Sequence, residues 1–255
     1  MVALTRPAEM GIASMIARIL ASLLLALGLS LAALAQPAAD PGVGGAAVAL
    51  QIFRELAESG DRNAQFNLGT FYDQGMGVPR DYAEALKWFR MAAEQGDVQA
   101  QSNVGIMYFL GQGTPQDDKE AVKWFRRAAE QNDASAQNNV GAMYAKGQGV
   151  EHDDEEAVKW YRRAAAQGHV LAQFNLGEMF EVGRGVAMDA AEAYFWFSLA
   201  ASSGNKDALQ HRLTLAMTLS QAQMSEAERA AGQWRPSLPK LCGGSSCNPP
   251  AERSI

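Results

Sequence analysis

Residues 136–171 read AQNNVGAMYAKGQGVEHDDEEAVKWYRRAAAQGHVL, and the same pattern occurs four times at a spacing of 36 residues. One such unit cannot bury its apolar face by itself, so consecutive units must stack on one another. The sequence therefore predicts an array of four repeats. Their bounds are 64–99, 100–135, 136–171 and 172–207.

Each repeat predicts two helices. The first half carries Ala-Gln, then Asn, an aliphatic residue and Gly, and then an aromatic residue, all at helical spacing. A glycine inside a helix costs about 1 kcal/mol relative to alanine, so a column of glycines indicates a packing role. We expect a bulky side chain of the second helix to approach the backbone there. The glycines of this column are Gly69, Gly105, Gly141 and Gly177.

A Gly-x-Gly turn follows the first helix, as at Gly147 and Gly149. Glycines supply the positive φ angles that end a helix and reverse the chain. A phosphate-binding loop would need a preceding strand and further glycines. Because this turn follows a predicted helix in every repeat, we interpret it as structural.

The second helix begins with Asp-x-x-Glu, which is typical of a capping box. In a capping box the first side chain accepts from amides of the first turn, and the Glu reaches back to the cap amide. This explains the acidic run at 151–156 without a metal ion, because the spacing of calcium ligands is absent. The pairs are Asp81/Glu84, Asp117/Glu120, Asp153/Glu156 and Asp189/Glu192.

The rest of the second helix follows the pattern Ala-x-x-Trp-aromatic-x-x-Ala-Ala. Small residues let helices approach closely, and large aromatic residues fill the space between repeats. We therefore predict that these columns form core rather than a ligand site. The second helices are expected to end in a left-handed cap, at Gly96, Asn132, Gly168 and Gly204.

The first 35 residues have the three-part pattern of a secretory signal peptide. Arg6 and Arg18 precede an apolar run, and Ala33-Leu34-Ala35 offers small residues for cleavage. An uncleaved membrane anchor is the alternative. With cleavage, we expect a periplasmic or secreted protein without a stable membrane span.

The repeats are expected to lie between two caps. A linker precedes an incomplete repeat that matches the second half of the pattern, and two helices follow the last repeat, the final one opened by a capping box at Ser220 and Gln223. A flexible tail completes the chain. The ranges are 1–35 for the signal peptide, 36–45 for the linker, 46–63 and 208–235 for the caps, and 236–255 for the tail.

The charge of the chain argues against a nucleic-acid partner. The full sequence has 22 basic and 28 acidic side chains, a net charge of −6. Loss of Arg6, Arg18 and Glu9 with the signal peptide leaves 20 basic and 27 acidic side chains, a net charge of −7. An acidic protein repels phosphate backbones.

The chain has two cysteines, Cys242 and Cys247, in the tail. In an oxidising compartment they can form a disulfide across the short Gly/Ser segment between them. Free or intermolecular thiols are the alternative. A metal site would need two more ligands, and no histidine lies nearby in the sequence.

The markers A-Q-x-N-L-G-x-x-Y, G-x-G-V and A-x-x-W, with the A-A-x-x-G ending, resemble the Sel1-like repeat family, a branch of the tetratricopeptide-type helical repeats. The resemblance covers residues 46–210, about two thirds of the chain. It implies an all-α, right-handed α-solenoid with a concave face. It also implies an adaptor for protein complexes, often in bacterial signalling or envelope processes.

The leading hypothesis is a non-enzymatic, exported adaptor that binds a protein or peptide on the concave face formed by the first helices. Columns that are fixed usually hold the repeat together, whereas columns that vary between repeats are available to recognise a specific partner. The fixed Asn column has two interpretations: its amide binds a peptide backbone, or it ties one repeat to the next. The candidate partner-binding residues are Phe66, Asn67, Thr70, Ser102, Asn103, Ile106, Asn138, Asn139, Ala142, Phe174, Asn175 and Glu178.

Two other functions compete with this hypothesis. A polysaccharide-binding protein would use exposed aromatic residues, with Phe66, Phe109 and Phe174 as candidates. An enzyme acting on β-lactams is the third, since Ser203 and Lys206 match Ser-x-x-Lys, but no Lys-Thr-Gly follows and no repeat contains cysteine. We expect no cofactor and no metal site, and the sequence does not indicate an oligomeric state.

Overall fold

The computed structural model describes residues 41–237. The predicted signal peptide, Cys242 and Cys247 lie outside this part of the chain. Within it the protein is all helical, with 11 helices and no strands. The helices are α2 (Pro41–Glu58), α3 (Arg62–Gln74), α4 (Tyr82–Glu94), α5 (Val98–Leu110), α6 (Asp118–Glu130), α7 (Ala134–Lys146), α8 (Asp154–Ala166), α9 (Val170–Val182), α10 (Ala190–Ser202), α11 (Lys206–Ala216) and α12 (Gln221–Gln233).

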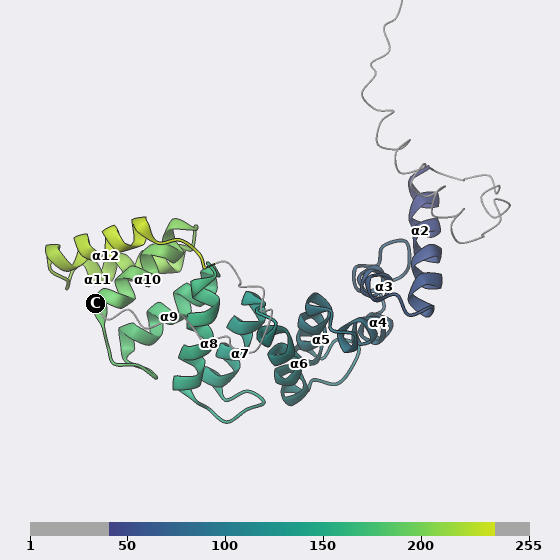
Figure 1. Ribbon diagram of the computed structural model, residues 1–255, viewed down its shortest axis with the longest axis horizontal. Helices are drawn as coiled ribbons and strands as arrows, with labels where there is room; N and C mark the ends of the chain where they lie inside the picture. Colours follow the sequence, from purple (N-terminus) through teal and green to yellow (C-terminus); the bar gives the residue numbers. More distant parts are fainter. Residues whose placement is uncertain (1–40, 238–255) are drawn as a thin grey trace, which may run out of the picture. The chain divides into compact units, whose positions relative to one another are not determined.

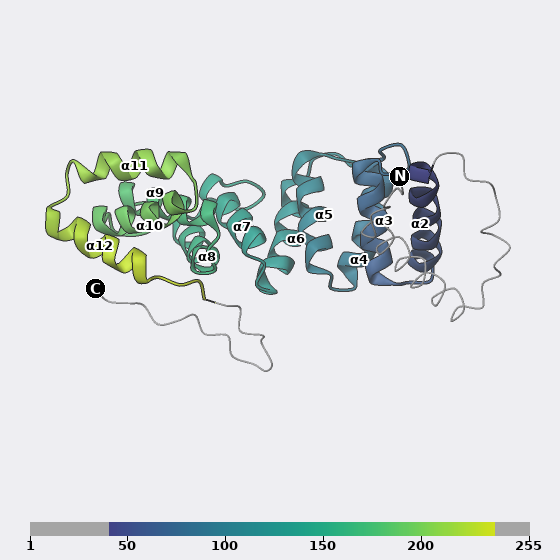
Figure 2. The ribbon, with the colours of Figure 1, turned by 90° about the horizontal axis from the view of Figure 1, so that it is seen from above.

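The helices from α3 to α10 form four consecutive pairs, each helix packing against the next along the chain. Figures 1 and 2 show these pairs following one another in tandem. The predicted all-α repeat fold is therefore confirmed. We call the first helix of each pair helix A (α3, α5, α7, α9) and the second helix B (α4, α6, α8, α10). None of the helices within residues 41–237 is both long and apolar enough to cross a membrane.

Helix α2 begins at Pro41, earlier than the predicted start at residue 46. Residues 41–45 are helical, so the linker predicted at 36–45 is wrong for its second half. Proline suits the first turn of a helix, because its fixed φ is helical and its missing N–H would have no partner there. The boundary between two units of the chain falls between residues 46 and 47, and α2 crosses it. In the second unit, Leu50 packs in one cluster with Leu68 and Trp88.

The glycines inside helix A allow the close approach predicted from the sequence. A Cβ atom placed on Gly105 would lie 2.6 Å from Cδ1 of Phe125 in helix B. The same geometry recurs in the other repeats, where the ring belongs to Phe89, Tyr161 and Phe197. The cost of glycine in a helix is offset by the burial of an aromatic ring against the bare backbone.

The Gly-x-Gly turn has two distinct roles. Gly147 has a φ of 65° and forms the left-handed C-cap of α7. Gly149 also has a positive φ, and a Cβ atom there would lie 2.2 Å from the carbonyl oxygen of Asp118 in the preceding repeat. The second glycine therefore sets the contact between two repeats, a role that the sequence pattern did not indicate.

The predicted capping boxes of helix B are only half present. Asp153 accepts a hydrogen bond from the Glu156 amide (2.9 Å), as expected. The amide of Asp153, however, donates to the carbonyl oxygen of Tyr144 in helix A (3.1 Å), so it has no need of Glu156. Glu156 instead accepts from Lys159. The prediction was wrong because a tertiary hydrogen bond satisfies the cap amide in every repeat.

The complete capping box predicted at Ser220 and Gln223 is confirmed at the start of α12. Helix α12 packs against α10, and the Tyr194 hydroxyl donates to Glu228 (2.8 Å). Figure 2 shows α11 and α12 on opposite sides of α10. After α12, the amide of Ser237 donates to the carbonyl oxygen of Ala166 (2.8 Å). The first residues of the predicted flexible tail are thus held against helix α8.

Candidate interaction face on helix A

A capping side chain sets the start of each helix A. Asp133 accepts from the amide of Ala136 (2.6 Å), and aspartates at equivalent positions cap α3 and α5. In the fourth repeat His169 takes this place, and its Nδ1 accepts from the Ala172 amide (3.2 Å). Burial lowers the pKa of His169, which keeps the ring neutral and able to accept. The sequence analysis did not predict these caps. The recurrence of Asp61, Asp97 and Asp133 at the repeat spacing could have indicated them.

The fixed glutamine of helix A links each repeat to its neighbours. Gln137 is 2% exposed. Its Nε2 donates to the Ala129 carbonyl of the preceding helix B (3.1 Å), and its Oε1 accepts from Gln167 at the end of its own helix B (2.8 Å). Gln65 and Gln101 make the same pair of bonds. The fixed glutamine column therefore has a structural role, since its amides are used within the array.

The fourth repeat lacks one partner of this glutamine ladder. Gln173 donates to the Ala165 carbonyl (3.3 Å), but its buried Oε1 has no hydrogen-bond partner among residues 41–237. The donor position at the end of helix B holds Ser203 in place of the glutamine found in repeats 1–3. An unpaired buried acceptor costs about 1–3 kcal/mol, so the array ends with an incomplete link.

Replacing Ser203 by Gln should raise the free energy of unfolding by about 1 kcal/mol, because its amide would supply the donor that Gln173 lacks. Ser203 has nearly the backbone conformation of Gln167, so the longer side chain needs no new backbone. Urea unfolding measures the change. Ser203→Ala serves as the control and should give no gain. Equal stability of Ser203→Gln and Ser203→Ala would contradict the ladder as an energetic link.

The twelve candidate partner-binding residues differ in exposure. Ile106 is 39% exposed, whereas Asn138 is 7% exposed and belongs to the interior. The other ten are half-buried: Phe66, Asn67, Thr70, Ser102, Asn103, Asn139, Ala142, Phe174, Asn175 and Glu178.

The aromatic candidates pack inward. The ring of Phe66 lies 5.6 Å from that of Phe89, and the ring of Phe174 lies 5.7 Å from that of Phe197. Phe109 also packs against a hydrophobic cluster. These three phenylalanines are therefore largely core residues, and they do not form the exposed aromatic surface that a polysaccharide site would use.

The asparagine column has a structural contact in one place. Nδ2 of Asn175 donates to Oδ1 of Asn138 (3.0 Å), which joins the helices A of two consecutive repeats. Within the described residues, the side chains of Asn67, Asn103 and Asn139 make no such hydrogen bond, and each is partly exposed. Their amides thus keep a donor and an acceptor free for a partner.

An exposed ridge runs along the varying column of helix A. Ile106 and Leu110 stand one turn apart on α5, and Leu110 is 56% exposed. Val182 occupies the position of Leu110 in the fourth repeat and is 60% exposed. The sequence prediction missed Leu110 and Val182. Their spacing could have indicated them, because Leu110 lies four residues after Ile106 and Val182 four residues after Glu178. Residues four apart share one face of a helix.

At repeat 4 the ridge carries acidic residues beside Val182. Glu178 is half-buried, and burial raises the pKa of its carboxyl, with Glu181 adding to the effect and His211 opposing it. His211 lies at the fifth position of the asparagine column, and its Nδ1 is 2.7 Å from Oε2 of Glu181. The ridge therefore offers apolar side chains at repeat 2, and an apolar side chain, Val182, together with carboxylates at repeat 4.

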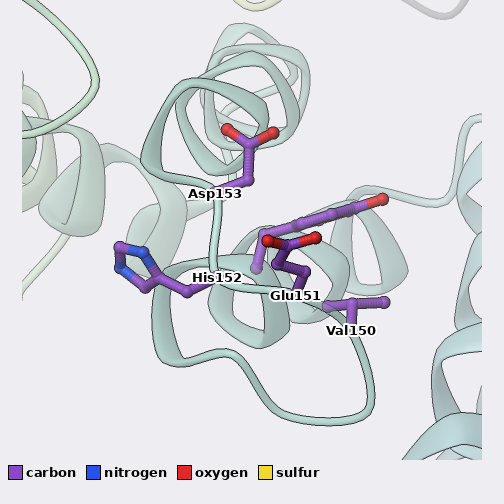
Figure 3. Close-up of a pocket in the computed structure, with 5 residues that line it drawn as sticks. Val150, Glu151, His152 and Asp153 are labelled. Carbon is purple, nitrogen blue, oxygen red and sulfur yellow. The ribbon is translucent and has the colours of Figure 1, made fainter.

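An open depression of about 530 Å³ lies beside the loop between α7 and α8, lined by Tyr144, Val150, Glu151, His152 and Asp153. In Figure 3 the side chains of Glu151, His152 and Asp153 point in different directions. Asp153 is already the cap of α8. Among the described residues, no group of three or more His, Cys, Asp or Glu side chains is placed to hold a metal ion.

The neighbouring Asp154 belongs to a contact between repeats. It accepts from Nε of Arg184 (3.2 Å) and from Nη2 of the same side chain (2.6 Å). The guanidinium also donates to the carbonyl oxygen of Ala145 (3.1 Å). The acidic run at 151–156 thus caps a helix and anchors the turn of the next repeat.

Comparison with known proteins agrees with this architecture. The family model of the Sel1 repeat matches residues 62–97, 98–133, 134–169 and 170–205, more than half of the chain. Each frame begins two residues before the one predicted from the sequence. Among curated proteins, none matches the chain.

Two solved structures are similar to it. A protective antigen of uropathogenic Escherichia coli with an SLR fold has 36% identity and a TM-score of 0.67, and the match covers 72% of this chain and 40% of that one. A Sel1 repeat protein from Oxalobacter formigenes has 32% identity and a TM-score of 0.62, with 75% and 78% covered. This chain therefore spans less than half the length of the first relative.

Proposed function

This chain belongs to the Sel1 repeat family, and we propose that it is a non-enzymatic, exported scaffold that binds a protein or peptide partner along helix A. Sel1 repeat proteins generally act as scaffolds for protein interactions. The single observation that supports this face is that the fixed and the varying positions of helix A have different surroundings. The fixed glutamine and glycine of helix A make contacts between helices, whereas the side chains of Ile106 and Leu110, at varying positions, are exposed to solvent.

The ridge suits a partner that buries apolar side chains. Covering the exposed aliphatic side chains of Ile106 and Leu110 removes apolar surface from water, which favours association. The free amides of Asn103 and Asn139 lie before and after this part of the ridge in the sequence and can pair with an extended backbone. A peptide or a surface segment of a protein has both features.

Export is supported by the sequence alone. Arg6 and Arg18 precede an apolar run that ends in Ala33-Leu34-Ala35, the pattern of a cleaved signal peptide. We therefore propose that the repeats act in the periplasm or outside the cell. Oxidation of Cys242 and Cys247 to a disulfide would follow from that location.

A photo-crosslinking amino acid placed at Ile106 tests the proposed face in intact cells. We expect a discrete adduct with a partner from Ile106, and an about tenfold smaller yield when Leu110 is also replaced by Asp, because a charge would disrupt the apolar contact. The matched control places the same amino acid at Glu226, an exposed residue of helix α12 that lies outside both helix A and helix B. Equal adducts from both positions, or no effect of Leu110→Asp, would refute binding along helix A.

The same cells distinguish the polysaccharide alternative. Retention of the protein by insoluble peptidoglycan, unchanged by Leu110→Asp and without a protein adduct, would favour a cell-wall ligand. We expect no such retention, since Phe66, Phe109 and Phe174 are packed against the core.

A further inference from the structure

The exposed side of helix B carries basic residues in repeats 1–3. One column is lysine, and each lysine is paired with the glutamate three residues before it: Lys87 with Glu84, Lys123 with Glu120, and Lys159 with Glu156. These charges are locally neutralised. A lysine next to its own carboxylate contributes little to the binding of an external anion.

The arginines of repeats 2 and 3 differ from these lysines. We call Arg126, Arg127, Arg162 and Arg163 the arginine face. Among the described residues, none of the four has a carboxylate within 4.0 Å, although the chain has more acidic than basic side chains. The same two helices therefore carry paired lysines and unpaired arginines.

Each of these arginines is held over an aromatic ring. The guanidinium carbon of Arg127 lies 4.4 Å from the ring centre of Trp124, and that of Arg163 lies 4.5 Å from Trp160. Arg126 and Arg162 lie over rings of the next helix A, at 5.2 Å and 5.5 Å. A guanidinium above a ring keeps its N–H donors at its edge, so it is positioned to bind a carboxylate through two hydrogen bonds.

The arginine face does not extend into repeat 4, where another part of the chain covers helix B. Repeat 4 has Ser198 and Leu199 at the positions of Arg162 and Arg163, and both are buried. Its helix, α10, packs against α12. In repeat 1, Arg90 has a carboxylate partner, Glu94, at 3.6 Å. On the B helices, the guanidinium groups without a carboxylate partner are thus confined to repeats 2 and 3.

We propose that the arginine face binds an acidic segment of a second protein, separately from the partner proposed for helix A. Carboxylates spaced along an extended chain match donors that recur from one repeat to the next. A short segment experiences the local field, which is screened over about 8 Å at physiological salt. A nucleic acid or an anionic bilayer extends over the whole surface, where the net charge of −6 repels it.

Fluorescence anisotropy of labelled poly-glutamate with the full chain tests this proposal. We expect binding that weakens about tenfold in R127Q/R163Q, because two bidentate contacts are lost. The matched control is K123Q/K159Q, which removes the same charge from the same helices and should weaken binding less than about threefold. Circular dichroism confirms that both variants fold. R127K/R163K keeps the charge without the planar fork and should fall between wild type and R127Q/R163Q.

Three results would overturn the proposal. One is the absence of poly-glutamate binding by the wild-type protein. Another is an equal loss in R127Q/R163Q and K123Q/K159Q, which would mean that only the overall charge matters. The third is tighter binding of a single-stranded oligonucleotide or of phosphatidylglycerol vesicles than of poly-glutamate, which would assign the face to phosphate ligands.

Discussion

Replacing Gly149 by Ala should lower the free energy of unfolding by at least about 3 kcal/mol. Gly149 has a φ of 69°, which costs an L-residue roughly 1–2 kcal/mol. In addition, the new Cβ atom would lie 2.2 Å from the carbonyl oxygen of Asp118. That oxygen belongs to the backbone at the start of helix α6, so it cannot move without displacing the helix. Urea unfolding of the purified protein measures the loss.

Gly96→Ala is the matched control for this prediction. Gly96 has a φ of 87°, but nothing lies within 4 Å of a Cβ atom placed there. We expect this variant to lose only the conformational term, roughly 1–2 kcal/mol. The difference between the two variants isolates the contact between repeats. If Gly149→Ala is no less stable than Gly96→Ala, the tight contact with Asp118 has no energetic consequence.

Phe197→Ala should cost about 4 kcal/mol, because it leaves a cavity in the core of the fourth repeat. The ring is 0% exposed and packs against the backbone of Gly177. Its centre also lies 5.7 Å from that of Phe174 and 4.9 Å from that of His211. The side chain therefore joins helix B of the last repeat to both its own helix A and to α11.

The loss in Phe197→Ala should be local as well as large. In a repeat array, stability is approximately a sum of units and nearest-neighbour interfaces, so the end next to the cavity opens first. Hydrogen exchange should show lost protection in α10, α11 and α12, with protection kept in α3 to α6. Phe195→Ala is the control, since that ring is half-buried, and we expect about 1 kcal/mol there. A uniform loss of protection along the array would argue against independent units.

The sequence was sufficient for the features that residue type and period determine. The column with Gly105 and Gly141 predicted the close packing of an aromatic ring, because period and residue type alone require it. The hydrogen bond from the Asp153 amide to the Tyr144 carbonyl oxygen could not be predicted from residue type and period. Propensity identified the cap but not the tertiary acceptor that replaced Glu156.

The candidate face was predictable only in part, for a similar reason. Variation between repeats identified Ile106, which is exposed, but also Asn138, which is buried. The difference arises because Asn138 meets Asn175 from the next repeat, a contact 37 residues away in the chain. Exposure on helix A depends on the neighbouring repeat, and a pattern within one repeat does not contain that information.

The contact at Gly149 also constrains how this protein can change length. Gly113, Gly149 and Gly185 each lie against the backbone at the start of the preceding helix B, in the same geometry. An insertion inside a repeat would shift one glycine out of this position, whereas duplication or loss of a whole unit would restore it. We therefore expect genes for such arrays to gain or lose sequence in steps of 36 codons, with insertions tolerated beyond the last repeat.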